Sequence, residues 1–165
     1  MKICGIDSGK LGAMACLDDK NSSVIYTRFK FDKQNILNAK MMSQFLYDMD
    51  ADMILMEKVS GRAGHGATQT FNWGFIVGQQ VLTALEHPIK FVTPQAWQKV
   101  CNEGCPGNLK AKEKSMISFM NLNPHKPLGE KPNNNIVDAF LIGLYGIHQF
   151  GTMSGMWNFE KYDYE

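Results

Sequence analysis

The sequence predicts one α/β domain built on a five-stranded mixed sheet with helices on both faces. Three short strand-like runs joined by turns open the chain, and two further apolar runs each follow a helical stretch. Runs joined by short turns are typical of antiparallel hairpins, whereas a strand reached through a helix lies parallel to an earlier strand. The 165 residues, of which 44% are hydrophobic and 20% charged, suit a single domain with an ordinary core.

The first half of the chain predicts four strands and a helix. The runs Lys2–Asp7, Gly12–Leu17 and Val24–Phe31 are strand-like and separated by turn residues. Apolar residues then recur every four positions through Asp32–Met49, which indicates a helix. Met53–Glu57 is short, apolar and unalternating, which is typical of a strand covered on both faces.

The second half of the chain predicts one strand among helices. Thr93 followed by proline is an N-cap with proline at the first helical position, so a short helix begins there. We assign residues 1–150 to the folded domain, because residues 151–165 form an aromatic and acidic tail with no clear period. The predicted elements are a helix at Thr68–Leu85, a strand at Ile89–Val92, and helices from Pro94, at Lys110–Met120 and at Asn134–Phe150.

The helix Thr68–Leu85 has two apolar stripes that cover more than half of its circumference. A helix of this kind must bury two sides. One side can pack on the sheet, and the other can face either a second subunit or the intramolecular core. We expect a homodimer built on this helix.

Three acidic residues far apart in the chain are embedded in apolar sequence. Asp7 ends the first strand before a glycine-containing turn, Glu57 ends the fourth strand, and Asp138 lies in the last helix. In the predicted sheet the first and fourth strands are adjacent and parallel, so their acids meet at one edge. Carboxylates held together repel unless a cation neutralises them. We therefore predict a divalent-metal site, although each acid alone is equally consistent with an ordinary turn, strand-end or helix-surface charge.

Asparagines precede the helical acid by one turn. Asn134 and Asn135 share a helix face with Asp138, so Asn135 can offer the site a neutral oxygen ligand. The alternative is that either asparagine caps the helix that follows Pro132.

Basic residues form local patches in a chain whose net charge is only +1. Any nucleic-acid surface must therefore be local. Such lysines can bind phosphates without reading bases, or they can belong to a solvated helix face balanced by Glu113. A histidine in the glycine-rich loop can donate to a phosphate or be merely solvated. The DNA-contact candidates are Arg62, His65, Lys99, Lys110, Lys112 and Lys114.

No apolar run approaches the ~18 residues that a membrane helix needs, and a strand begins at the second residue. We therefore expect no membrane span, no signal peptide and a cytoplasmic location. Cys4, Cys16, Cys101 and Cys105 are expected to be free thiols. The Cys101-x3-Cys105 spacing leaves a zinc site as the alternative.

Five short motifs occur in a fixed order between about residue 2 and residue 148. Together they resemble the motifs of RuvC-type Holliday junction resolvases, especially the phage-type branch, whose fold is ribonuclease-H-like. Each motif alone is weak, whereas their ordered combination is fairly specific. The motifs are Gly5–Ala13, Met56–Val59, Val92–Lys99, Glu113–Ser115 and Val137–Gly143.

The resemblance implies a Mg²⁺-dependent endonuclease of DNA recombination and repair. It would act as a homodimer that nicks two opposing strands of a four-way junction, in the bacterial host cytoplasm if the protein is phage-encoded. Two Mg²⁺ ions per site, or Mn²⁺ as a substitute, would be bridged by Asp7 and completed by Glu57 and Asp138. Lys114 matches the lysine motif of the family and is the expected catalytic lysine.

Two positions depart from the family pattern. Bacterial members carry another aspartate where this chain has Asn135, and a base-stacking aromatic where it has Ser60. The first departure leaves open a non-catalytic branched-DNA-binding protein, and the second removes any basis for a sequence preference. A nuclease of the same fold that acts on flaps, forks or RNA–DNA hybrids is a further alternative. A sugar-kinase or actin-like ATPase is disfavoured, because those need a second such domain.

Overall fold

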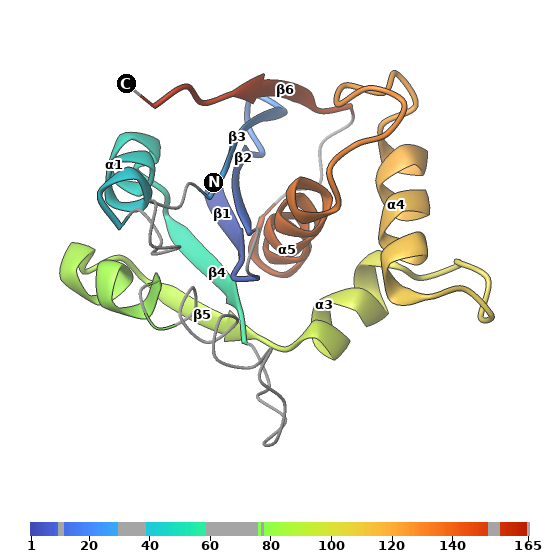
Figure 1. Cartoon of the computed structure of the whole chain (residues 1–165), viewed down its shortest axis with the longest axis horizontal. Coiled ribbons are helices and arrows are strands. Elements are labelled where there is room, and N and C mark those ends of the chain that lie inside the picture. The colour runs from blue at the N-terminus through green and yellow to red at the C-terminus, as the bar shows by residue number, and fades with distance from the viewer. Residues whose placement is uncertain (10–11, 30–38, 59–75, 77, 152–155, 165) are drawn as a thin grey trace, which may run out of the picture.

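The computed structural model describes residues 1–9, 12–29, 39–58, 76, 78–151 and 156–164. In this part of the chain a six-stranded sheet lies between two groups of helices (Figure 1). The strands, in sheet order, are β5 (Ile89–Val92), β4 (Met53–Glu57), β1 (Lys2–Asp7), β2 (Ala13–Asp18), β3 (Ser23–Arg28) and β6 (Asn158–Lys161). The helices are α1 (Ala39–Met49), α3 (Pro94–Cys101), α4 (Ala111–Leu122) and α5 (Asn134–Phe150), and residues 78–85 are also helical.

The predicted mixed topology is confirmed. β1, β2 and β3 pair antiparallel, while β4 lies parallel to β1 and β5 parallel to β4. β1, β4, β5 and α5 begin and end at the predicted residues, and the other described elements differ by a few residues at their ends. Residues 32–38 of the first predicted helix, and residues 68–75 and 77 of the second, lie outside the described part of the chain.

The sheet has one strand more than the five we expected. β6 comes from the tail and pairs parallel to β3. Its attachment begins with Trp157, which is 1% exposed and packs edge-on against Phe140 of α5. Phe159 adds contacts to the rings of Phe119 and Phe140. Only one of the four β6 residues is apolar, so the strand has no alternation that a sequence pattern could reveal.

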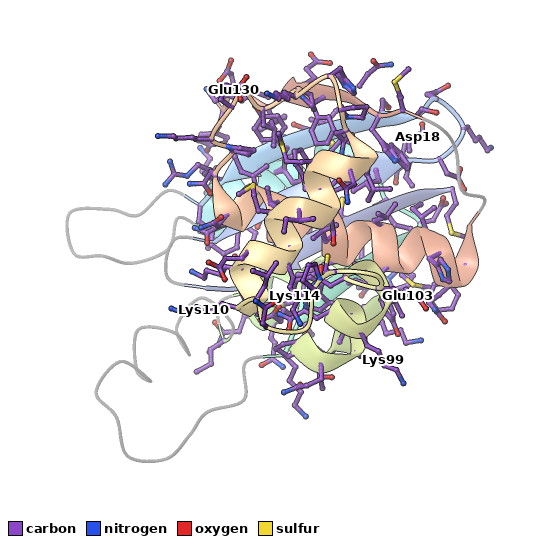
Figure 2. All side chains as sticks on the ribbon, turned by 90° about the vertical axis from the view of Figure 1, so that its right-hand side faces the viewer. Asp18, Lys99, Glu103, Lys110, Lys114 and Glu130 are labelled. Atoms are coloured by element: carbon purple, nitrogen blue, oxygen red, sulfur yellow. The ribbon has the colours of Figure 1, made fainter. Side chains whose placement is uncertain are left out.

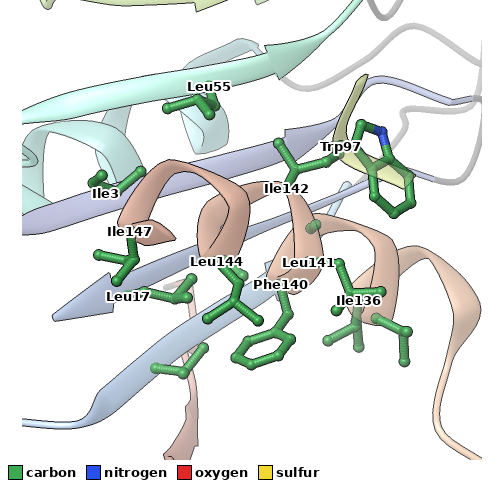
Figure 3. Packing of buried hydrophobic residues seen from close by; sticks show 14 of the residues in the cluster. Ile3, Leu17, Leu55, Trp97, Ile136, Phe140, Leu141, Ile142, Leu144 and Ile147 are labelled. Carbon is green, nitrogen blue, oxygen red and sulfur yellow. The ribbon is translucent and has the colours of Figure 1, made fainter. Parts of the chain in front are cut away.

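Both faces of the sheet are buried, which explains why its strands have nearly continuous apolar sequence. One core lies between the sheet and α3, α4 and α5, where side chains such as Ile3, Leu17 and Leu55 surround α5 (Figure 3). The other core lies under α1 and residues 78–85. Cys4 and Cys16 are buried free thiols in this second core, as predicted. No helix in the described residues is both long and apolar enough to cross a bilayer.

Helix α5 meets β1 by direct backbone contact. A Cβ atom on Gly5 would lie 2.2 Å from the Ala139 carbonyl oxygen and 2.3 Å from the Gly143 nitrogen. Only a residue without a side chain fits between these elements. Because Asp7 follows this contact on β1 and Asp138 precedes it on α5, the contact fixes how closely the two acids approach.

Gly5→Ala is expected to destabilise the fold by about 1–3 kcal/mol, because the new methyl group must push α5 away from the sheet. Urea unfolding of both proteins measures the loss. Gly107→Ala is the matched control, since a Cβ atom there would meet nothing within 4 Å. Equal stabilities for Gly5→Ala and wild type would contradict the close contact.

Candidate active site

Three acids from different elements line one pocket of about 560 Å³. Asp7 and Glu57 each stand at the carboxyl end of a strand, one residue beyond the paired Ile6 and Met56 of the parallel β1–β4 pair. Asp138 comes from the second turn of α5, which packs on β1. The described residues that line the rest of the pocket are Gly9, Trp97, Gln98, Ala111, Lys112, Ser115, Asn133, Asn134 and Asn135.

Local hydrogen bonds orient two of these carboxylates. Asp7 Oδ1 accepts from the Gly9 backbone N–H at 2.9 Å, which closes a tight turn after β1. Ser8 Oγ donates to the Glu57 carbonyl oxygen at 2.9 Å and so ties the two strand ends together. Trp97 Nε1 donates to Glu57 Oε2 at 2.8 Å from a ring that is 1% exposed. Because core packing holds this indole, it holds the Glu57 carboxylate as well.

Burial and mutual repulsion raise the pKa values of the acids. The pKa of Glu57 rises to about 7, first through burial and then through the Asp7 charge, and the Trp97 hydrogen bond opposes the rise. The pKa of Asp138 rises to about 6 for the same first two reasons, opposed by Ser115 and Lys112. Burial also raises the pKa of Asp7. A fully ionised pocket is therefore costly, and a cation would relieve the cost.

The pocket suits a cation that keeps ligands of its own. Among the described residues, no group of three or more His, Cys, Asp or Glu side chains is arranged to hold a metal ion by itself. Mg²⁺ binds through one or two carboxylates and completes its shell with waters and substrate phosphates. The oxygen donors of Asp7, Glu57 and Asp138 fit such an ion, with water and a phosphate-bearing substrate as the source of the other ligands.

The asparagines divide their roles. Asn133 is the N-cap of α5, and its side chain accepts from the backbone N–H groups of Asn135 and Ile136. The capping role that we considered for Asn134 or Asn135 therefore belongs to their neighbour. Asn134 and Asn135 line the acidic pocket from the first turn of α5.

The lysines separate into two groups. Lys112 lines the acidic pocket, and its charge lowers the pKa of both Asp7 and Asp138. Lys114, which the motif favoured, does not line this pocket. Its Nζ donates to the Gly107 carbonyl oxygen at 3.3 Å, and with Lys99 it lines a separate hollow of about 410 Å³.

Lys110 stands at the start of α4, where its backbone N–H donates to Glu113 Oε2 at 2.8 Å. Figure 2 shows Lys99, Lys110 and Lys114 gathered at the end of the molecule where α3 and α4 meet. Arg62 and His65, the two loop candidates, lie outside the described residues, as does Ser60.

Trp97 and Ser115 belong to motifs in the sequence, but neither had an individual role assigned there. Trp97 was noted only as part of a motif, although an indole ring that packs in a core while its N–H needs an acceptor is a usable signal. Ser115 is 2% exposed, and its Oγ faces Asp138 without reaching regular hydrogen-bond geometry to any group. No sequence pattern distinguishes this serine from others on amphipathic helices.

The chain is similar to known proteins in structure but not in sequence. No family model and no curated protein matches the sequence. Thermus thermophilus RuvC, solved in complex with a Holliday junction substrate, matches with a TM-score of 0.66 and 12% identity over 92% of this chain and 98% of that one. The chain has the RuvC-type fold.

Two further solved structures are similar to this RuvC-like chain. The fowlpox virus Holliday junction resolvase has a TM-score of 0.53 and 14% identity over 90% of this chain and 99% of that one. The yeast mitochondrial Holliday junction resolvase has a TM-score of 0.54 and 15% identity over 90% and 81%. The ribonuclease-H-like fold implied by the sequence motifs is therefore confirmed.

Proposed function

We propose that this RuvC-like chain is a metal-dependent endonuclease that resolves four-way DNA junctions by paired nicks. The observation that carries the proposal is the gathering of Asp7, Glu57 and Asp138 in one pocket. Burial raises the pKa of all three, and the Asp7 charge raises those of Glu57 and Asp138 further. A solved protein of the same fold, RuvC, is in complex with a Holliday junction substrate.

The three carboxylates would hold Mg²⁺, or Mn²⁺ in its place, and the bound ions would activate the attacking water and stabilise the leaving oxygen. Trp97 holds Glu57 in position through its indole N–H. The Lys112 ammonium group would attract the DNA phosphate into a pocket that otherwise repels it. The buried hydroxyl of Ser115 could donate a hydrogen bond to a phosphate oxygen of a bound substrate, or to Asp138. Asn135 would contribute a neutral oxygen.

Cleavage of a synthetic four-way junction tests the proposal directly. Wild-type protein is incubated with junction, linear duplex, flap and RNA–DNA hybrid in Mg²⁺, in Mn²⁺ and in chelator. We expect symmetric nicks in the junction that require the metal. Preferential cutting of flap or hybrid would favour the same-fold alternative, and junction binding without any cutting would favour a non-catalytic branched-DNA-binding protein.

Paired nicks require two active sites, which supports a homodimer through the helix predicted at Thr68–Leu85. Within its described part, Val81 and Leu82 are buried against the sheet, while Ile76 is 48% exposed. We expect a dimer mass by light scattering at micromolar concentration, with and without junction DNA. A strictly monomeric mass in both conditions would exclude this assembly.

Asn135→Asp is expected to lower the Mg²⁺ concentration needed for half-maximal cleavage, because it adds a carboxylate to the pocket. In chelator at neutral pH the added charge should also lower the melting temperature. A first-turn acid gains about 0.3–1 kcal/mol from the helix dipole, which opposes the loss. The melting temperature therefore falls only if the repulsion exceeds that gain, whereas the Mg²⁺ titration does not depend on it.

Since Asn133 caps the helix, a change in capping cannot explain either result. Cleavage rate against Mg²⁺ concentration, with melts in chelator, measures both effects. Superimposable Mg²⁺ titrations for Asn135→Asp and wild type would leave position 135 outside the metal shell.

A further inference from the structure

A second pocket lies at the same edge of the sheet as the acids. β3 is antiparallel to β2, which is antiparallel to β1, and β6 is parallel to β3. β1, β3, β4 and β6 therefore all end at one edge. The second pocket, of about 460 Å³, is lined by the last residues of β3 and β6, by the connection that precedes α5 and by the first turn of α5.

The two pockets share one residue. Asn133 lines both of them. Its Oδ1 accepts from two backbone N–H groups of α5, which fixes the side chain and leaves its NH₂ group as a donor between the pockets. The two pockets are therefore adjacent, and a ligand in one of them lies next to the other.

The lining combines an apolar floor with a polar rim. Tyr26, Leu128 and Ile136 supply apolar surface, and the Tyr26 ring lies on the α5 face of the sheet beside Phe159. Arg28 is exposed at the rim.

The described residues of this rim carry a net positive charge. Lys161 pairs with Asp163 at 2.6 Å, and Arg28 adds one more positive charge to the described lining. An aromatic and aliphatic floor beside a cation is the chemistry that binds a nucleobase together with its phosphate.

We propose that this pocket, the nucleotide pocket, binds one unpaired nucleotide of the DNA strand whose neighbouring phosphate lies in the acidic pocket. The proposal rests on the proposed function and assigns a further subsite to it. The volume is within the range of small-ligand pockets. A nucleotide at a branch point has already lost part of its stacking, so drawing its base out of the stack costs least there.

The test combines two ways of removing the same contact. After the cleaved phosphate is located on a gel, junctions are made with an abasic site at the nucleotide on either side of it. Arg28→Ala and Leu128→Trp, which fills the pocket, are compared with wild type, and melting curves confirm that both variants fold. Lys20→Ala is the charge-matched control, because it removes one cation from the β2–β3 turn at the opposite edge of the sheet.

We expect each pocket variant to lower kcat/KM for the intact junction about 10-fold, in line with the loss of one base-stacking contact. One of the two abasic junctions should show the same loss with wild type and no further loss with Leu128→Trp. Arg28→Ala should still lower its cleavage, because an abasic nucleotide keeps the phosphate that Arg28 would contact. Lys20→Ala should behave as wild type on every junction.

The result that overturns the nucleotide pocket is cleavage by wild type with additive effects of Leu128→Trp and the abasic site, or with no effect of either. In that case the junction-resolving function stands. A wild-type protein that neither binds nor cleaves any junction refutes the proposed function instead, and the nucleotide pocket with it.

Discussion

Asp7→Asn is expected to reduce Mg²⁺-dependent cleavage of a four-way junction by roughly 1,000-fold or more, while junction affinity changes by only a few-fold. The carboxylate lies where both neighbouring acids sense its charge, so its loss removes the common ligand of the proposed metal site. The proposed DNA binding would depend instead on lysines, which the substitution leaves in place.

Glu57→Gln and Asp138→Asn should show the same separation of cleavage from binding. Gel shifts in chelator measure affinity, and single-turnover cleavage in Mg²⁺ measures the chemical step. Glu160→Gln, which neutralises an exposed acid on β6, is the control and should cut as wild type. An active-site variant that cuts at the wild-type rate would remove its residue from the site.

Lys112 and Lys114 give a sharper comparison within one helix. If the lysine that lines the acidic pocket is the one that assists cleavage, Lys112→Ala should slow single-turnover cleavage more than Lys114→Ala does. The sequence motif predicts the opposite order, so the same assay decides between the two lysines.

In chelator, the free energy of unfolding is expected to fall as the pH rises from about 4 to about 7. The folded-state pKa of Glu57 is about 7 against 4.5 for the free group, and that of Asp138 is about 6 against 3.8. The folded state therefore holds these protons more tightly than the unfolded state. This stabilisation is complete below the unfolded pKa values and is lost as the pH rises through the folded ones.

Glu57→Gln should remove most of the Glu57 share of this pH dependence. A shift from 4.5 to about 7 corresponds to about 3 kcal/mol at pH 8. That difference should raise the melting temperature of the variant by roughly 6–12 °C in chelator. The amide oxygen of Gln can still accept from Trp97, so the packing is kept.

The stabilisation by Glu57→Gln should disappear near pH 4, where the wild-type carboxyl is protonated. At pH 8, Mg²⁺ should reduce the difference in melting temperature between the two proteins, because it binds and stabilises the wild type more. Thermal melts of both proteins at pH 4, 6 and 8, with and without Mg²⁺, measure each of these effects. If the difference in melting temperature between the two proteins were the same at all three pH values, the Glu57 carboxyl would have an ordinary pKa.

Local sequence patterns predicted the elements that are buried along their own length, because their apolar residues stand next to one another in the sequence. β1, β4 and α5 are long or strongly apolar, and their predicted bounds match the structure. β6 was missed because its attachment depends on Trp157 and Phe159, which contact Phe119 and Phe140 on other elements. No pattern within the tail records such contacts.

The same distinction explains the candidate site. Strand ends locate Asp7 and Glu57, because adjacent parallel strands bring their ends together. A motif on a helix, in contrast, does not by itself show which side chain points into the pocket. Lys112 and Lys114 are about 200° apart around α4, so a difference of two residues decides which one enters the pocket. The contact of Trp97 with Glu57 joins residues 40 positions apart and is visible only in the fold.

The contact of Gly5 with α5 has a consequence for how this protein can evolve. Side-chain packing can be redistributed by compensating substitutions, whereas backbone atoms in contact offer no alternative rotamers. The separation of Asp7 from Asp138 is therefore insulated from drift in the hydrophobic residues around it. Substitutions among the apolar side chains can leave this separation unchanged, whereas any side chain at Gly5 would force β1 and α5 apart.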